Sequence, residues 1–563
     1  MWRMNYKLLF ILCIFVFVIT FSLWSSCGNI PIADLYSRPN SDDNSVSYQL
    51  RGIECHINNN EVIDCRKDKD EVFIPFSFIK KYFEINGKLS LVDGVQQFDW
   101  SHSFSKIYIP KGKYDPRGIF MHFENYNVEI RDRVKCISAI DGVPISTQWQ
   151  SQGYYYPTQI AQFGLSHYSK NLTEPQQRKT IVENANTIRA DWVIPPHSKL
   201  EIDLDDRNNR NKILKFYCDD IVDNGIVLKM DHVLDLVMGV DILLRNNGSL
   251  KIVLQNRENK DNYTLIYVAS DILISAQDDV IYHGIGQANT WKHLTRDLVV
   301  DLQKGLALLY QDKSRKKLSK TKIKITSISL LGDGQLDNLT LASSEHITQF
   351  YAAAEWFINN QDASGGWPNA VKRRVASGFE ELQNGWYSAM GQGHAISVLA
   401  RAYYHSNGDK RYLNAALAGL RPFRVPSYQG GVLATFLGKY IWFEEYPTSP
   451  PSFVLNGFIY SLLGLYDLKT LAPRGEAKEA TLLFNEGMLS LKNMLLLYDL
   501  GSGTSYDLRH FTLKVAPNVA RWDYHATHVN QLLLLSTIDA DPLLATTAER
   551  WMGYMSGKRA AHN

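Results

Sequence analysis

The spacing of apolar residues changes at about residue 343, and this change constrains the fold of the chain more than any other feature. Between residues 105 and 342, short apolar runs such as 226–228 alternate with clusters of Asn, Gly and Asp. Short strands separated by turn signals are typical of an antiparallel β-sandwich or barrel. After residue 343, apolar side chains recur at helical spacing, starting with Ile347 and Phe350. The sequence therefore predicts a β-rich domain over 105–342 and a separate helical domain over 343–563.

One predicted helix of the second domain is apolar on nearly every side. A serine and two prolines at 449–451 predict its start, and apolar residues continue over 453–466. Such a helix needs neighbours all round, as the inner helices of a two-layered helical ring have. Amphipathic helices are predicted at about 477–497 and 524–537. We therefore predict a multidomain α+β chain whose C-terminal domain is an α/α-toroid, or barrel.

The chain begins with a charge-free apolar segment at 8–24, preceded by Arg3 and Lys7. This segment is long enough to span a bilayer, and the basic residues before it favour a cytoplasmic N-terminus. A cleaved signal peptide is the alternative, because small residues follow the segment. The sequence thus predicts a cytoplasmic tail and transmembrane signal anchor over 1–29, then a stem with a small folded element over 30–104.

Two further patterns agree with a luminal location. Sequons for N-glycosylation begin at four asparagines: Asn171, Asn247, Asn262 and Asn338. Beyond the anchor, four cysteines are candidates for disulfide bonds, in pairs that the sequence does not decide: Cys55, Cys65, Cys136 and Cys218. The formal charge is only +2, from 60 basic and 58 acidic residues, which argues against a nucleic-acid partner.

Ionisable and aromatic residues gather in three links of the helical domain, at 442–447, 506–511 and 518–525. Links between the helices of a toroid meet at the ends of the barrel, so these three could converge on one cleft. Glu445 could then act as a general base beside tyrosine proton donors, with Arg509 binding an anion. The alternative is that these residues are structural. The glutamate would then interact favourably with a helix dipole, and an arginine and an aspartate would form an ion pair packed beside an aromatic ring. No glycine-rich nucleotide loop and no His-Glu-x-x-His motif is present, so neither a dinucleotide cofactor nor the commonest helical zinc site is predicted.

Several ungapped strings resemble the heparan sulfate (heparosan) D-glucuronyl C5-epimerase family. In the helical domain they are 385–390 (GWYSAM), 444–448 (EEYPT), 452–458 (SFVLNGF), 501–504 (GSGT), 506–511 (YDLRHF) and 520–525 (ARWDYH). Upstream, the matching strings are 152–157 (QGYYYP) and 164–170 (GLSHYSK), and the C-terminal 559–563 (RAAHN) agrees as well. The resemblance extends from about residue 145 to the C-terminus.

The resemblance implies an isomerase that inverts carbon 5 of D-glucuronate within heparan sulfate or heparin precursor polysaccharide, giving L-iduronate. It also implies a homodimeric type II Golgi membrane glycoprotein with a luminal catalytic part and no organic cofactor. Its expected partners are N-sulfated heparosan and other heparan-modifying Golgi enzymes. A proton beside a carboxylate is weakly acidic, so one group must remove it while another returns a proton from the opposite face.

The resemblance assigns roles residue by residue. Glu445 and Tyr524 fall at the family's opposed proton carriers, and Tyr446 and Tyr506 fall at supporting or shuttling tyrosines. Arg509 falls at an arginine expected to hold the uronate carboxylate. The further substrate-binding positions are Asn518, Arg521, Trp522, Asp523, Tyr154, Tyr155, Tyr156, Gln159 and Gln162.

Two charged features lie outside these positions. Asp337 falls at a ligand of the family's calcium ion, which is expected to be structural because it is held by hard oxygen ligands. A basic run at 313–324 could attract heparan chains, or it could form a solvated loop face.

Two other functions stay open from the sequence. A polysaccharide lyase on a similar toroid would begin with the same proton abstraction and then expel the substituent on carbon 4. A catalytically silent heparan-binding Golgi protein would use the cleft for binding alone. The product of the reaction separates the three, because only the lyase creates an unsaturated sugar.

Overall fold

A computed structural model describes residues 50–57, 61–83, 85–101, 105–205, 208–219, 225–309 and 318–561. They fall into two compact units, one ending at Glu84 and one beginning at Ile85, which are described separately. The predicted tail, anchor and first part of the stem lie outside the described residues, and so does 313–317 of the basic run. Within the described ranges, no helix is both long enough and apolar enough to cross a bilayer.

The first unit contains a small antiparallel sheet and one helix. Its strands are β1 (Arg51–Ile57), β2 (Glu61–Asp68) and β3 (Glu71–Phe73), followed by α2 (Phe76–Phe83). A disulfide bond between Cys55 and Cys65 joins β1 to β2. Cys136 and Cys218, the other two candidates, are free and buried in the second unit. The disulfide therefore lies in the segment that the sequence predicts as a stem with a small folded element.

The second unit opens with a two-stranded hairpin, β4 (Asn86–Val92) and β5 (Val95–Ser101). Asp93 and Gly94 connect the strands with φ angles of 51° and 80°, the left-handed conformation that a two-residue hairpin turn requires. Leu89, Leu91 and Val95 of this hairpin are 70%, 71% and 62% exposed. The hairpin thus presents apolar side chains on its surface.

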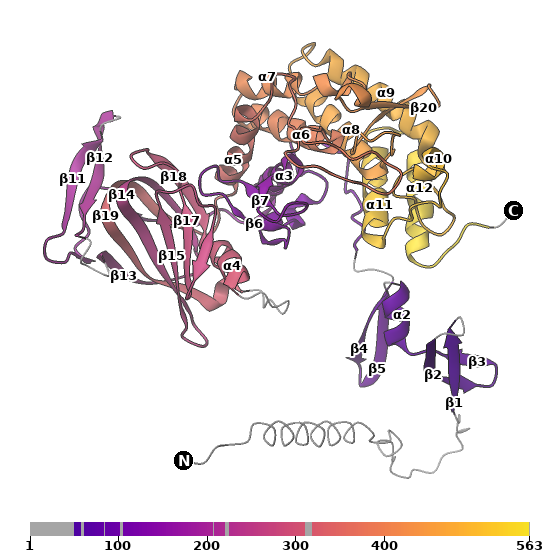
Figure 1. The fold of residues 1–563 in the computed structure, drawn as a ribbon, viewed down its shortest axis with the longest axis horizontal. Helices are drawn as coiled ribbons and strands as arrows, with labels where there is room; N and C mark the ends of the chain where they lie inside the picture. The colour runs from indigo at the N-terminus through magenta and orange to yellow at the C-terminus, as the bar shows by residue number, and fades with distance from the viewer. Residues whose placement is uncertain are drawn as a thin grey trace, which may run out of the picture. The chain divides into compact units, whose positions relative to one another are not determined.

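The predicted β-rich domain is built around two long antiparallel strands, β14 (Val237–Asn256) and β19 (Ile323–Ala342) (Figure 1). Alternate residues such as Leu250, Ile252 and Leu254 are fully buried, as a sheet with one covered face requires. Helix α4 (Leu298–Leu309) packs against this sheet. The shorter strands are β9 (Lys179–Glu183), β10 (Trp192–Val193), β11 (Lys199–Asp205), β12 (Asn208–Tyr217), β13 (Ile226–Val233), β15 (Asn262–Val268), β16 (Ser275–Gln277), β17 (Val280–Gly284) and β18 (Lys292–Asp297).

The helical domain has two layers, as the sequence predicts (Figure 1). The inner helices, buried along most of their length, are α3 (Pro157–Thr173), α6 (Ala389–His405), α8 (Leu455–Leu471) and α11 (Trp522–Ser536). The outer, amphipathic helices are α5 (His346–Asn359), α7 (Lys410–Ala418), α9 (Lys478–Met494) and α12 (Pro542–Met555). Each outer helix packs on an inner one, and α6 meets α8 so closely that a Cβ on Gly464 would lie 2.1 Å from the Gly393 carbonyl oxygen.

Helix α3 is the main departure from the predicted domain boundaries. It precedes the sandwich in the sequence, yet Ile160, Phe163 and Leu165 pack into the hydrophobic core of the helical domain. Residues from Tyr114 onward contribute to the same core. The predicted β-rich range 105–342 therefore also contains part of the helical domain, because tertiary packing, which the local pattern does not report, brings that part back.

The start of α8 also differs from the prediction. Ser449 is not its cap, because the helix begins at Leu455 after an extended segment. The backbone N–H groups of Ser452 and Phe453 donate instead to the buried carboxylate of Glu444, at 3.2 and 3.0 Å. A carboxylate that accepts these donors fixes the path of the link into the helix, so Glu444 has a structural role.

Candidate active site

A cleft of about 460 Å³ opens in the helical domain. Its wall is formed by the links and inner helices of the domain together with the segment that precedes α3. The predicted site residues that line it are Glu445, Tyr446, Tyr524, Asp523, Tyr156, Gln159 and Gln162. The structure thus brings together residues that lie almost 370 positions apart in the sequence, counted from Tyr156 to Tyr524.

Glu445 occupies the link that follows β21 (Tyr440–Phe443), a short strand paired with β20 (Leu433–Phe436). Its side chain is buried, and Oε2 has no hydrogen-bond partner among the residues described. Burial raises the pKa of Glu445 to about 7; the Tyr446 hydroxyl opposes that rise and the charge of Asp507 adds to it. A carboxylate with a pKa near neutrality and a free oxygen in a cleft can act as a general base.

Three tyrosines surround this carboxylate. Tyr446 follows it in the same link, Tyr524 lies in the first turn of α11, and Tyr506 backs Tyr524 with its ring 4.9 Å away, edge to face. Burial raises the pKa of Tyr446, Tyr506 and Tyr524, and the nearby Glu445 charge adds to the rise in each case. The phenols are therefore protonated near neutral pH, and they can donate where Glu445 can accept.

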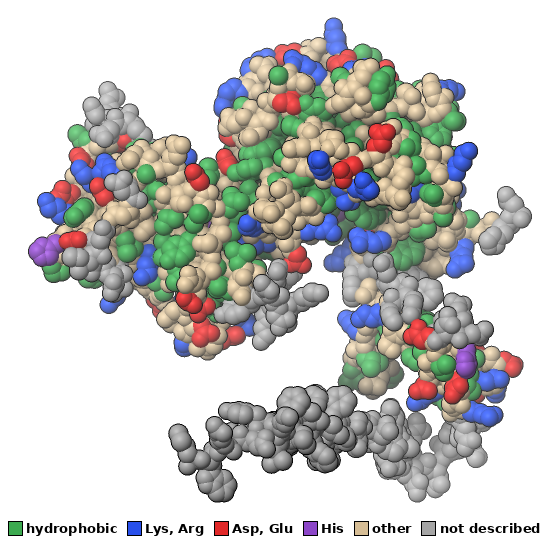
Figure 2. Space-filling view, viewed as in Figure 1, with side chains coloured by type: hydrophobic (Ala, Val, Ile, Leu, Met, Phe, Trp, Pro, Cys, Tyr) green, Lys and Arg blue, Asp and Glu red, His purple; other side chains and the backbone are tan. Residues whose placement is uncertain are grey.

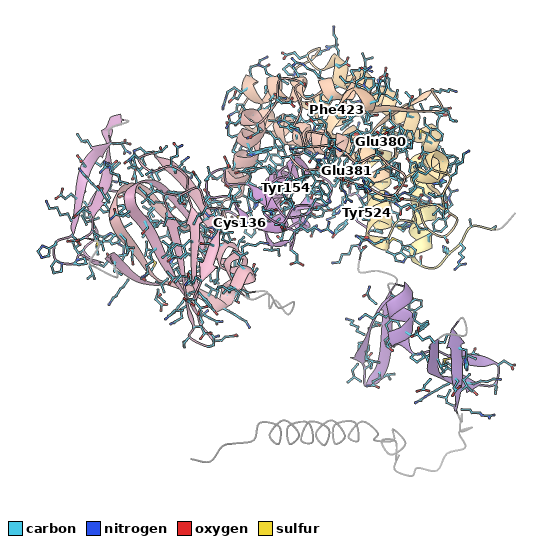
Figure 3. All side chains as sticks on the ribbon, viewed as in Figure 1. Cys136, Tyr154, Glu380, Glu381, Phe423 and Tyr524 are labelled. Atoms are coloured by element: carbon cyan, nitrogen blue, oxygen red, sulfur yellow. A yellow bond between two sulfur atoms is a disulfide. The ribbon has the colours of Figure 1, made fainter. Side chains whose placement is uncertain are left out.

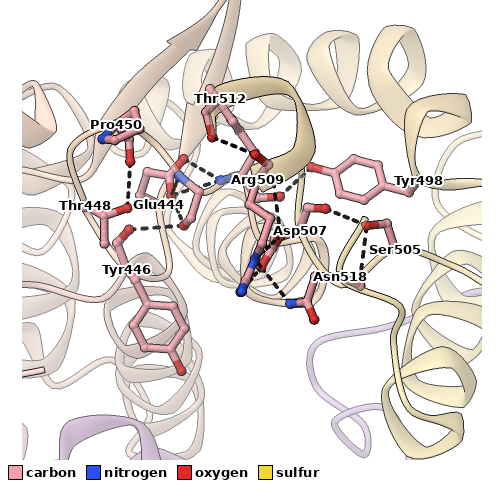
Figure 4. Close-up of polar contacts among 12 residues, drawn as sticks. Glu444, Tyr446, Thr448, Pro450, Tyr498, Ser505, Asp507, Arg509, Thr512 and Asn518 are labelled. Atoms are coloured by element: carbon pink, nitrogen blue, oxygen red, sulfur yellow. Dashed lines mark hydrogen bonds and ion pairs between the residues drawn. The ribbon is translucent and has the colours of Figure 1, made fainter. Parts of the chain in front are cut away.

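Arg509 is held in an ion pair beside the cleft (Figure 4). Its Nε donates to both oxygens of Asp507 at 2.9 Å, and its Nη2 donates at 2.6 Å. Asn518 donates to the same carboxylate at 2.9 Å. Because Asp507 is fully buried, it needs this counter-ion, and a break in the pair would leave an uncompensated buried charge. Neither Arg509 nor Asn518 is part of the cleft wall.

The other predicted binding residues divide between the cleft and its surroundings. Tyr154 and Tyr524 are labelled in Figure 3. Tyr154 is buried against Trp149 and Tyr156, whereas Tyr524 of α11 lines the cleft. Tyr155 turns away and donates from its hydroxyl to Asp141.

The α11 entrance holds three further positions predicted to bind substrate. Arg521 pairs with Asp523 at 2.9 Å, and its guanidinium lies 5.3 Å from the centre of the Tyr524 ring. The ring of Trp522 meets His525 edge to face. Of these three, Asp523 lines the cleft.

The sequence did not point to several residues of the cleft wall. Lys106, Tyr126, Arg131 and Arg133 come from a segment without the matching strings, and Tyr460 is indistinguishable by pattern from the core of α8. A charge count along 105–133 was the one available signal, because basic residues recur there beside aromatic ones.

The position of Glu445 depends on a glycine in the first turn of α8. A Cβ placed on Gly457 would lie 2.3 Å from Oε2 of Glu445 and 2.6 Å from its Cβ. We expect Gly457→Ala to displace the carboxylate and to lower kcat by about 10²-fold with little change in KM, since small misplacements of reacting groups cost that much. Steady-state kinetics together with thermal unfolding test this.

Gly487→Ala on α9 is the matched control, because its Cβ would meet the end of the Leu462 side chain, 2.4 Å away. Gly487→Ala should lower the thermal unfolding midpoint and leave kcat nearly unchanged. A Gly457→Ala variant with the kcat of the original protein would contradict the role of Gly457.

Comparison with known proteins identifies relatives of both domains. Residues 361–553 match the family described as D-glucuronyl C5-epimerase C-terminus, and residues 210–333 match its beta-sandwich domain. The D-glucuronyl C5-epimerase of Caenorhabditis elegans is 37% identical over 93% of this chain and 92% of its own length. An uncharacterised protein of Methanocaldococcus jannaschii is 36% identical over 27% of this chain and 47% of its own. A Clostridium thermocellum endo-1,4-beta-D-xylanase structure covers 30% of this chain and 28% of its own at 11% identity, with a TM-score of 0.18.

Proposed function

This chain belongs to the D-glucuronyl C5-epimerase family and is an epimerase, and from that premise we propose that Glu445 and Tyr524 are its two proton carriers. The reaction inverts carbon 5 of D-glucuronate residues to give L-iduronate, and we propose N-sulfated heparosan as the polymer. The observation that carries the assignment is the buried carboxylate of Glu445, whose Oε2 has no hydrogen-bond partner among the residues described and which shares one cleft with the Tyr524 phenol.

The charge states support opposed roles for the two groups. With a pKa of about 7, Glu445 is ionised in a useful fraction of molecules at neutral pH and can take the proton from carbon 5. Burial raises the pKa of Tyr524, so its phenol carries a proton that it can return to the other face of the sugar ring. For the opposite epimer the roles reverse. Tyr446 lies beside Glu445, where it can stabilise the charge that develops.

The test is incubation of the purified chain with N-sulfated heparosan in deuterium oxide, followed at carbon 5 by NMR. We expect deuterium at carbon 5 together with new iduronate signals. An unsaturated uronate would replace the proposal by a lyase. Binding of the polymer without any exchange would replace it by a silent binding protein.

We also propose a type II Golgi membrane location with a luminal catalytic part. The apolar segment 8–24 supports an anchor, and the Cys55–Cys65 bond is of the kind that persists in oxidising compartments. The four asparagines of the predicted sequons are exposed, as glycan attachment requires.

A homodimer is proposed because the β4–β5 hairpin exposes apolar side chains. Leu89, Leu91 and Val95 would be covered by a second copy of the chain, and exposed apolar patches commonly mark such interfaces. Other heparan-modifying Golgi enzymes stay proposed partners on the resemblance alone. Sedimentation tests the dimer: the original protein should sediment as a dimer and the Leu89→Ser variant as a monomer.

Asp337 on β19 is proposed to hold a structural calcium ion. Burial raises the pKa of Asp337, amide donors from Asn211 and Asn338 oppose this, and the charges of Asp241 and Asp205 add to it. A divalent cation would relieve the repulsion between these carboxylates. Carboxylate oxygens are the hard ligands that calcium prefers. Within the described ranges no three His, Cys, Asp or Glu side chains form a metal group, so amide or backbone oxygens would complete the coordination.

Calcium is therefore expected to raise the thermal unfolding midpoint of the protein. At 100 times the dissociation constant the gain is about 2.7 kcal/mol, from the binding of a ligand to the folded state alone. Asp337→Asn should lose this response, whereas Asp191→Asn, an exposed aspartate of the same domain, should keep it. An unfolding midpoint that ignores calcium would contradict the site.

A further inference from the structure

The cleft wall carries three basic side chains that have no acidic partner. They are Lys106, Arg131 and Arg133, and none forms an ion pair with a residue in the described part of the chain. The acidic side chains of the same wall are Glu445 and Asp523, and Asp523 is already paired with Arg521. The wall therefore has a local excess of positive charge in a chain that is almost neutral overall.

This excess is not a general property of the surface. Figure 2 shows Lys and Arg side chains gathered along the lower edge of the helical domain, whereas acidic and basic side chains alternate over the remaining visible face. A concave site lined by one sign of charge concentrates ligands of the other sign. An anionic ligand is the complement of this wall.

The loop that carries the two arginines is held from the sandwich domain. Lys304 of α4, which is 6% exposed, donates to the carbonyl oxygens of Arg131 and Val134 at 2.7 and 2.8 Å. The carbonyl oxygen of Arg133 accepts from the backbone N–H of Thr147 at 2.8 Å. A buried ammonium and a backbone bridge thus fix the path of this short segment, as a preorganised binding site requires.

The two arginines differ in how their side chains are held. Arg131 donates from Nη1 to Oε1 of Gln162 at 2.8 Å, and its guanidinium lies 5.0 Å from the centre of the Tyr126 ring. Arg133 is exposed to the cleft, and within the described part of the chain its guanidinium has no hydrogen-bond or ion-pair partner. The side chain of Arg131 is therefore oriented by its contacts with Gln162 and Tyr126, whereas the guanidinium of Arg133 is available to a ligand.

Of the three unpaired cations of the cleft wall, Arg133 is the one whose charge acts on the pKa of the proposed proton carrier Tyr524. Burial raises the pKa of Tyr524, Glu445 and Asp523 add to the rise, and Arg521 and Arg133 oppose it. Arg521 is paired with Asp523 and Arg509 with Asp507, so of these three arginines Arg133 is the one without an acidic partner in the described part of the chain.

We propose that Arg133, with Arg131 beside it, binds an oxyanion of the polysaccharide next to the reacting carbon. This rests on the proposed function. Two groups of N-sulfated heparosan have that chemistry, the carboxylate of the reacting uronate and the N-sulfate of a neighbouring glucosamine. A guanidinium on the carboxylate would also stabilise the charge that moves onto it when the carbon 5 proton leaves.

The test measures binding of three polymers to the full chain and to Arg133→Gln: N-sulfated heparosan, N-acetylated heparosan and carboxyl-reduced N-sulfated heparosan. We expect Arg133→Gln to bind N-sulfated heparosan about 10- to 100-fold more weakly, the range for a charged hydrogen bond. If the ligand is the carboxylate, the loss extends to the N-acetylated polymer and vanishes with the carboxyl-reduced one. If it is the N-sulfate, the pattern is reversed.

The matched control is Arg189→Gln, which removes one exposed arginine of the sandwich domain that pairs with Asp191 at 2.6 Å. It changes net charge equally and should leave all three affinities unchanged. Arg133→Gln should also shift the alkaline limb of the kcat profile to higher pH, because it removes a charge that lowers the pKa of Tyr524. Thermal unfolding and Arg133→Lys separate loss of charge from loss of folding.

Unchanged affinity of Arg133→Gln for all three polymers, with the original kcat, would overturn the proposal. That outcome is distinct from failure of the proposed function, which is measured on the unmodified protein by exchange at carbon 5. If the unmodified protein exchanges carbon 5 and forms iduronate while Arg133→Gln binds all three polymers normally, the Arg133 subsite is refuted and the proposed function stands.

Discussion

Glu445→Gln is expected to stop inversion at carbon 5, with kcat lower by about 10²- to 10⁴-fold, the usual contribution of a general base. The amide keeps the shape of the side chain and fills the same buried space beside Gly457. It cannot take a proton, so the loss should appear in kcat while the affinity for N-sulfated heparosan changes little. Conversion of glucuronate to iduronate under saturating polymer measures it.

The pH dependence gives the control for Glu445. Its pKa is raised to about 7, so the protonated, inactive form of the base accumulates below that pH. The rate in the direction that uses Glu445 as base should therefore rise with pH through about 7, and Glu445→Gln should lack this limb. The neighbouring Glu444 also has a pKa raised to about 7 by burial, but its oxygens accept hydrogen bonds from Ser452 and Phe453. Equal kcat for Glu445→Gln and the original protein would remove Glu445 from the mechanism.

Tyr524→Phe is expected to lower kcat by a similar factor of about 10²- to 10⁴-fold, because it deletes the group that returns the proton. Polymer affinity should stay within a few-fold, since the ring and its contact with Tyr506 remain. Glu445 is intact in this variant and can still remove and return a proton on its own face. We therefore expect deuterium exchange at carbon 5 without inversion, confined to one of the two epimers.

Tyr428→Phe serves as the control for Tyr524→Phe, because Tyr428 is 82% exposed and is not part of the cleft wall. It should retain full activity. A fully active Tyr524→Phe, or exchange in both epimers at the original rate, would assign the second proton carrier to another group.

The division into a sandwich and a helical domain could be predicted because strand and helix periodicities are local properties of the sequence. The same holds for the approximate places of α9 and α11, whose apolar residues recur at helical spacing. The place of α3 could not be predicted in this way. Its pattern indicates a helix, but only packing against Ala353 and Val398, about two hundred positions away, decides which domain it joins.

The candidate site was predicted to the extent that it lies in the links of the helical domain. Glu445, Tyr446 and Tyr524 meet in one cleft as expected, but Arg509 lies beside it because buried Asp507 takes two of its nitrogens. The wall that carries Arg131 and Arg133 was not predicted. Such a wall results from contacts distant in sequence, and no local period encodes them.

The attachment of that wall has a consequence for which part of the chain can be produced alone with its cleft intact. The backbone N–H of Tyr108 and the carbonyl oxygen of Lys106 bond to Asn530 at 2.7 and 3.0 Å, and Tyr114 donates its N–H to Thr537 at 3.0 Å. A segment that precedes the sandwich in the chain is thus hydrogen-bonded to α11 and its C-terminal end, and Lys304 of α4 donates a hydrogen bond to the same segment. A fragment limited to residues 343–563 would contain Glu445 and Tyr524 without the segment that supplies Lys106, Arg131 and Arg133 to the cleft wall. A truncated form that keeps this cleft must therefore include the segment from residue 105 onward.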